Sequence, residues 1–320
     1  MHWLPRRALW VLAQFTVAGS ALLLLGCERK PPDAARKDTA VSVVPLQDSV
    51  VAPTPVASAW DTTAGSALFV AGGTPQEALV IAPRYTTEAS LDSVVLDPSR
   101  LQSVRLELFR GGQSVGAALV ASLAGGSRTD SCRSWPTARL RPSPGDTLTD
   151  PWNVAFEAGH AAPIALDSIE SLASADSARL AADIARLASA LPGDTAAIFR
   201  GLPFVVTKAW RAHLSGGQTV LSAVVVRNVN QEANPRQERI LLIAERDSLN
   251  ARYSARYSER TVGLEETIET TDVIAMLLLG SERRPTVIVT RDSGNGVSYA
   301  LIERVGGEWQ RRWASAYAGC

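Results

Sequence analysis

The sequence predicts a mainly β protein with one prominent helix, arranged as an antiparallel meander, a sandwich or a propeller-like fold. Two observations lead to this prediction. Short apolar segments of strand length alternate with Gly, Pro and Asn turn signals over two long stretches. Only residues 175–191 carry apolar side chains at clear helical spacing. Because the chain has 320 residues, 46% of them hydrophobic, it is long enough to bury a sizeable core.

Residues 1–26 are typical of an export signal, with Arg6 and Arg7 before an apolar stretch. The stretch ends in Leu24-Leu25-Gly26-Cys27, which resembles the lipobox of bacterial lipoproteins. The resemblance implies cleavage before Cys27, acylation of Cys27 and attachment to a membrane of the cell envelope. Glu28, rather than Asp, follows the cysteine, which in that family favours the outer membrane. The alternative is an uncleaved anchor, since about 18 apolar residues just span a bilayer.

Residues 27–59 are expected to form a tether. This segment is rich in Pro, Ala, Asp and Ser and has no sustained strand or helix periodicity. A flexible segment of this length averages about 30 Å from end to end, which would hold a domain away from a membrane surface. A short first strand at residues 41–44 is the alternative.

A first β-rich region is expected over residues 60–170. Val104, Leu106 and Leu108 alternate with charged residues, and a Gly111-Gly112 turn leads into a second apolar strand, which predicts a hairpin. These three apolar side chains should face the core. Further strands are expected over 67–70, 78–82, 115–123 and 152–157.

Residues 171–200 are expected to form a helical linker element between two β-rich regions. Leu180, Ile184, Leu187 and Leu191 recur at helical spacing, so they should form the buried stripe. Ser174 is the expected N-cap, and Pro192-Gly193 should stop the helix. Such an Ala-rich helix is expected to pack across a sheet or between two halves of the protein.

Residues 201–320 are expected to form the second β-rich region. Turn signals separate most of its apolar segments at the regular spacing of an antiparallel meander. The expected strands cover residues 204–214, 219–229, 239–245, 273–279, 286–290, 297–305 and 308–313.

The last 45 or so residues, from Asp272, resemble the carboxy-terminal unit of FG-GAP/VCBS-like propeller repeats. The resemblance rests on Pro285-Thr-Val-Ile-Val, a Gly-Asn-Gly turn, Tyr299-Ala-Leu-Ile and Gly306-Gly-Glu-Trp. It implies a propeller blade with a calcium loop before the proline. The three acidic positions of that loop align with Leu278, Gly280 and Glu282. Two oxygen ligands are therefore missing, and the sequence predicts no metal site and no other cofactor.

Cys132 and Cys320 are the only cysteines after Cys27. In an exported protein such a pair is most economically a disulfide. The bridge would close a long loop and contribute at most about 5 kcal/mol. Two buried free thiols and a reactive thiol are the alternatives.

The sequence identifies no catalytic residues. After the signal only His160 and His213 remain, and neither lies in a metal-ligand or catalytic motif, so structural roles are expected for both. The acidic residues Glu265, Glu266, Glu269 and Asp272 are expected to be a solvated edge rather than a cation site.

Five aromatic residues interleaved with arginines near the end of the chain could form a ligand platform. Trp309, Arg311 and Trp313 should share one face of a strand by parity. Core and cross-strand packing is nevertheless the preferred interpretation. The residues are Tyr253, Tyr257, Trp309, Trp313 and Tyr317.

Two functional hypotheses follow. The first is a lipid-anchored, non-enzymatic envelope protein whose β-rich module binds an unidentified envelope component or ligand or has a structural role. The second is an envelope hydrolase whose Ser, Asp and His come together only in the fold. A formal net charge of zero argues against nucleic acid as a partner, because phosphate binding needs clustered Lys and Arg.

Overall fold

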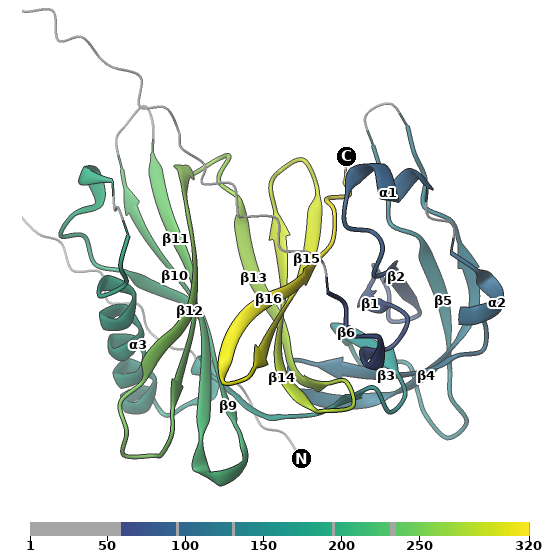
Figure 1. Cartoon of the computed structure of the whole chain (residues 1–320), viewed down its shortest axis with the longest axis horizontal. Helices are drawn as coiled ribbons and strands as arrows, with labels where there is room; N and C mark the ends of the chain where they lie inside the picture. The colour runs from purple at the N-terminus through teal and green to yellow at the C-terminus, as the bar shows by residue number, and fades with distance from the viewer. Residues whose placement is uncertain (1–58, 94–95, 130–131, 194–195, 231–234, 320) are drawn as a thin grey trace, which may run out of the picture. The chain divides into compact units, whose positions relative to one another are not determined.

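The chain folds into three antiparallel β-sheets and one long helix (Figure 1). The computed structural model describes residues 59–93, 96–129, 132–193, 196–230 and 235–319. One sheet closes into a six-stranded barrel and the other two have five strands each. The predicted mainly β fold with one prominent helix is confirmed. The expected signal, Cys27 and all of the expected tether except residue 59 lie outside the described residues.

The barrel has the strand order β1-β2-β5-β4-β3-β6. Its strands are β1 (Leu68–Ala71), β2 (Glu77–Ile81), β3 (Arg105–Arg110), β4 (Gln113–Ala124), β5 (Thr137–Pro142) and β6 (Val154–Glu157). The expected hairpin β3–β4 is present, and the two strands expected over 67–70 and 78–82 pair as the hairpin β1–β2. Leu106 and Leu108 point into the barrel core, as their alternation predicted. Around the barrel lie three short helices, η1 (Thr62–Ala64), α1 (Glu88–Ser93) and α2 (Pro98–Leu101).

The two open sheets are mostly simple meanders. The strand order of one is β12-β11-β10-β9-β8, and that of the other is β16-β15-β14-β13-β7. The first contains β8 (Ala165–Ser168), β9 (Val205–His213), β10 (Thr219–Val229), β11 (Arg236–Arg246) and β12 (Ser254–Leu264). The second contains β7 (Ala161–Ala162), β13 (Thr270–Leu279), β14 (Arg284–Asp292), β15 (Val297–Val305) and β16 (Glu308–Ala314). The remaining short helices are η2 (Ile169–Ser171), η3 (Ala197–Phe199) and η4 (Ser215–Gly217).

The β13–β16 sheet is buried on both faces. On β14, Ile288 belongs to the core shared with the barrel, whereas Val287 and Val289 belong to the core shared with the β8–β12 sheet. Successive side chains of a strand point to opposite faces, so a strand covered on both sides must be apolar throughout. This explains why the sequence shows continuous apolar runs here instead of alternation.

The long helix α3 (Ser174–Ser189) covers the other face of the β8–β12 sheet. Leu180, Ile184 and Leu187 are buried in one core cluster with residues of β9, β10 and β11, which confirms the predicted apolar stripe. The N-cap position is Ala173, which makes no side-chain cap hydrogen bond, so the expectation for Ser174 was wrong. Ser174 lies inside the first helical turn.

Strand β12 was not expected from the sequence. It is an edge strand that pairs with β11 on one side. Its residues are exposed or half-buried along its whole length, and three of them, Arg256, Glu259 and Arg260, are charged. Edge strands are commonly protected by such charges, which remove the apolar signal on which strand prediction depends.

The expectation that Trp309, Arg311 and Trp313 share a face is wrong. On the neighbouring strand β15, Leu301 pairs with Trp313 and Ile302 pairs with Arg311, so Arg312 is an extra residue. Such a β-bulge reverses the facing of the residues that follow it. Trp309 lies in the core between the two open sheets, whereas Trp313 lies in the core beside the barrel.

Candidate functional site

A cleft of about 830 Å³ lies beside the barrel and next to His160. Its walls come from η1, the segment after β2, helix α2 and the end of β6. This volume is in the range of about 300–1,000 Å³ that is usual for small-molecule sites. The lining residues are Trp60, Thr62, Gly65, Ser66, Ala82, Pro83, Arg84, Leu96, Asp97, Arg100, Leu101, Glu157 and His160.

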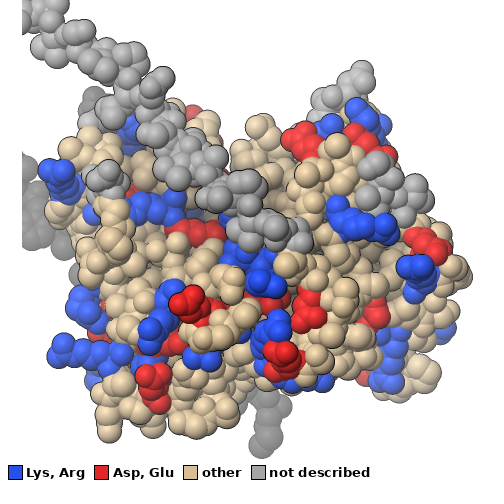
Figure 2. Space-filling view, in the orientation of Figure 1, with Lys and Arg blue, Asp and Glu red and all other residues tan. Residues whose placement is uncertain are grey.

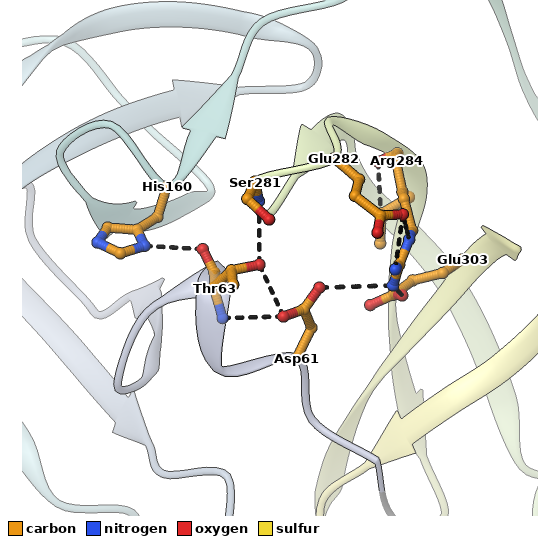
Figure 3. Close-up of polar contacts among 8 residues, drawn as sticks. Asp61, Thr63, His160, Ser281, Glu282, Arg284 and Glu303 are labelled. Atoms are coloured by element: carbon orange, nitrogen blue, oxygen red, sulfur yellow. Dashed lines mark hydrogen bonds and ion pairs between the residues drawn. The ribbon is translucent and has the colours of Figure 1, made fainter.

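His160 is fixed at the cleft by the backbone of η1. Its Nδ1 lies 2.8 Å from the Thr63 carbonyl oxygen, which can only accept, so Nδ1 carries the hydrogen (Figure 3). Its Nε2 lies 3.9 Å from Glu157 Oε2. The imidazole therefore has one nitrogen committed to the fold and one available at the cleft.

The turn between β13 and β14 packs directly onto this segment (Figure 3). The Ser281 amide donates to Thr63 Oγ1 at 2.9 Å, and the Gly280 amide donates to the His160 carbonyl at 2.9 Å. Gly280 has a φ of 70°, and a Cβ there would lie only 2.7 Å from Thr63 Oγ1. A residue with a side chain would therefore push this turn away from η1.

An arginine bridge continues the network away from the cleft (Figure 3). The Arg284 guanidinium lies 2.8 Å from Glu282, 3.4 Å from Asp61 and 3.7 Å from Glu303. Hydrogen bonding from Thr63, together with Arg284, holds the pKa of Asp61 below its usual value. Glu303 is only 3% exposed, and its burial raises the pKa of its carboxyl group. The pKa values of two carboxyl groups beside Arg284 are therefore shifted in opposite directions: that of Asp61 is lowered by hydrogen bonding, and that of Glu303 is raised by burial.

Ser66 and Glu157 form a second pair at the cleft. The Ser66 hydroxyl donates to Glu157 Oε1, and the Ser66 amide donates to the same oxygen at 2.8 Å. Ser66 thus lines the same cleft as Glu157 and His160, although Ser66 and Glu157 are 91 residues apart in sequence. In a Ser–His–acid triad the histidine lies between the serine and the acid. Here the carboxylate occupies the middle position.

His213, the other histidine considered, lies elsewhere. Its Nε2 is 2.8 Å from Asp167 Oδ2, which also accepts from Arg211 Nη2 at 2.7 Å. These contacts, led by the hydrogen bond from His213, hold the pKa of Asp167 below its usual value. All three residues lie on the adjacent strands β8 and β9, so they form a cross-strand ionic group.

The predicted partner of Cys132 is Cys320, which lies outside the described residues. Their neighbours are paired: Arg133 and Gly319 form an antiparallel bridge, with the Arg133 amide donating to the Gly319 carbonyl at 3.0 Å. The disulfide between Cys132 and Cys320 stays a prediction.

The aromatic residues near the end of the chain are packing residues. Tyr253, Trp309 and Trp313 are buried in three different core clusters, and Tyr257 packs against one of them. The Tyr317 hydroxyl donates to Glu269, a member of the acidic run. The preference for core packing is therefore confirmed for Tyr253, Trp309 and Trp313.

Charges of both signs are mixed on the face shown in Figure 2. Asp272, another member of the acidic run, pairs with Lys208. Within the described ranges, no group of three or more His, Cys, Asp or Glu side chains is placed to hold a metal ion. None of the helices in the described part of the chain has the length and apolarity needed to cross a bilayer.

Comparison of the chain with protein-family models, curated proteins and solved structures finds no match. Function must therefore be argued from the site itself. Sequence reasoning singled out His160 but missed Ser66, Glu157 and Asp61, which contact or surround its segment. No motif could have revealed them, because the closure of the barrel and the β13–β14 turn bring them together.

Proposed function

We propose that this protein is a lipid-anchored envelope protein whose β-rich body is a binding module, with the cleft beside His160 as its ligand site. The anchor is Cys27, and Glu28 favours the outer membrane. The observation that carries the binding role is the cleft itself. It has the volume of a ligand site, an apolar wall that includes Trp60 and Leu101, and a polar rim.

A broad apolar docking patch is less well supported. In the described part of the chain, the exposed large hydrophobic residues are few and lie on different elements. They are Ile198, Val205, Leu249 and Leu264, in η3, at the start of β9, in the β11–β12 loop and at the end of β12. Binding sites for macromolecules usually expose a larger contiguous patch. A small molecule in the cleft therefore fits better than a large apolar partner.

Co-purification tests the proposal. The full-length protein would be isolated from its own envelope, and small molecules would be extracted and identified by mass spectrometry. Thr62→Trp fills the cleft from an exposed position, and Thr87→Trp is the matched control at an exposed position outside it. We expect a molecule that accompanies the wild type and the control but not Thr62→Trp. Equal recovery from all three proteins would overturn the proposal.

A hydrolase is the second candidate, because Ser66, Glu157 and His160 line the same cleft. Its weakness is that Ser66 donates to Glu157 rather than to His160. A fluorophosphonate probe tests it directly. Covalent labelling of Ser66 that is lost in His160→Ala would favour the hydrolase, whereas an unlabelled protein would favour the binding module.

A further inference from the structure

One oxygen of each carboxylate at the rim of the cleft already accepts two hydrogen bonds from the protein. Asp97 Oδ1 accepts from the Ser99 amide at 3.0 Å and from the Ser99 hydroxyl at 2.6 Å. Glu157 Oε1 accepts from both the amide and the hydroxyl of Ser66. One oxygen of Asp97 thus holds the local turn that begins α2, and one oxygen of Glu157 holds Ser66 from the other side of the barrel closure.

The donors at the rim are much less committed. Arg84 is exposed, and its guanidinium makes no hydrogen bond or ion pair with any residue that the structure describes. The side chain of Arg100 is 81% exposed, and its Nε lies 3.4 Å from Asp97 Oδ2, which is a weak surface pair. His160 adds a nitrogen whose closest charged neighbour is 3.9 Å away.

The wall of the cleft is apolar beside these donors. Ala82 and Leu101 are about 95% buried, and Trp60, Pro83 and Leu96 are half-buried. The Trp60 ring is held in place because its Nε1 donates to the Gly65 carbonyl at 2.8 Å and its edge packs on Trp313. A preorganised aromatic wall of this kind binds hydrocarbon at little entropic cost.

From the partly occupied carboxylates, the exposed guanidinium groups and the apolar wall, we infer that the cleft binds a single-chain amphiphile with one carboxylate head group. Arginine presents paired N–H donors that match a carboxylate. A head group with two negative charges fits less well, because Asp97 and Glu157 lie in the same rim and repel added negative charge. This inference rests on the proposed function and gives the chemical class of its ligand.

Calorimetric titration of the full-length protein in lipid nanodiscs tests the inference, with empty nanodiscs as the baseline. The probes are hexanoate, hexyl phosphate and hexanol, which share a tail and differ in head group. Hexanoate is expected to bind at one site at least about tenfold more tightly than hexanol, the size of effect that a charge-assisted hydrogen bond gives. Hexyl phosphate is expected to bind more weakly than hexanoate.

Two arginine variants locate the head group. The double variant Arg84→Gln/Arg100→Gln should lose about tenfold or more in hexanoate affinity and leave hexanol unchanged. Arg110→Gln, at an exposed arginine on β3 outside the cleft, is the matched control and should bind as the wild type does. Added salt should weaken hexanoate binding to the wild type.

Several results would overturn the inference. They are equal binding of hexanol and hexanoate, tighter binding of hexyl phosphate, no binding of any probe, or an unchanged affinity in the double variant. If hexanol binds as tightly as hexanoate and Thr62→Trp abolishes the binding of both, the binding module stands and only the carboxylate head group is ruled out. If the co-purifying molecule is recovered equally from the wild type and from Thr62→Trp, the proposed function itself is overturned.

Discussion

Trp309 and Trp313 lie on the same strand, yet their rings are buried on opposite faces of the β13–β16 sheet. Trp309 Nε1 donates to Glu245 at 2.8 Å on the side of the β8–β12 sheet. Trp313 Nε1 donates to the Pro83 carbonyl at 2.8 Å on the side of the barrel. The bulge at Arg312 thus lets one strand anchor two cores and place Trp313 behind the cleft wall.

Trp313→Ala should strongly destabilise the protein. The ring is 1% exposed, and its removal leaves a cavity as well as an unpaired Pro83 carbonyl. The expected loss in unfolding free energy is about 3–5 kcal/mol, measured by urea denaturation. Arg110→Ala, at an exposed site, should change it by less than about 0.5 kcal/mol. Similar midpoints for the two variants would show that Trp313 is not a core residue.

Ile184→Ala tests the contact of α3 with the β8–β12 sheet. Ile184 is fully buried, so the substitution should lower the unfolding free energy by about 2–5 kcal/mol. Arg179→Ala, on the exposed face of the same helix, is the control for any change in helix propensity. If both variants unfold at the wild-type midpoint, the helix does not contribute to the core.

Glu303→Gln should change how stability depends on pH. Burial raises the pKa of Glu303, so the folded protein holds this proton more tightly than the unfolded chain. The resulting stabilisation is fully present below the unfolded pKa and is lost as pH rises through the folded pKa. The unfolding free energy of Glu303→Gln minus that of the wild type should therefore be larger at pH 7 than at pH 4.

The control for this pH experiment is Glu282→Gln. It removes an exposed carboxylate that pairs with the same guanidinium, Arg284. The unfolding free energy of Glu282→Gln therefore shows the effect of removing one partner of Arg284 while the buried carboxyl group of Glu303 is kept. If the unfolding free energy of Glu303→Gln minus that of the wild type stays constant with pH, or becomes smaller toward pH 7, the raised pKa of Glu303 is contradicted.

Thiol labelling tests the proposed disulfide between Cys132 and Cys320. Native protein denatured without reductant should expose no free thiol at these two positions. Reduction should expose both and should lower the unfolding free energy by at most about 5 kcal/mol. Two labelled thiols in freshly isolated, unreduced protein would refute the bridge.

Strands with many apolar residues and flanking turn residues could be predicted from the sequence, and strands without these features could not. Strand β10 has the expected bounds, Thr219–Val229, because most of its residues are apolar and turn signals flank it. Strand β12 was missed because an edge strand carries charges where a central strand carries apolar residues. The predicted strand face of Trp313 was wrong because a single-residue bulge does not alter the pattern of apolar residues in the sequence.

The candidate site was predictable only in part. His160 was notable as one of two histidines after the signal, but its partners depend on long-range contacts. Thr63 lies 97 residues away and binds through a backbone carbonyl, which no sequence motif encodes. Glu157 reaches Ser66 across 91 residues through the β1–β6 pairing that closes the barrel.

Mass spectrometry of the amino terminus tests the central proposal, a lipid-anchored binding module, most directly. The full-length protein would be purified from its own envelope beside a Cys27→Ser variant. We predict that the wild-type chain begins at Cys27 and carries an acyl-modified cysteine, and that the variant is neither acylated nor processed at this position. A wild-type chain that retains residues 1–26, or that carries an unmodified Cys27, would contradict the account.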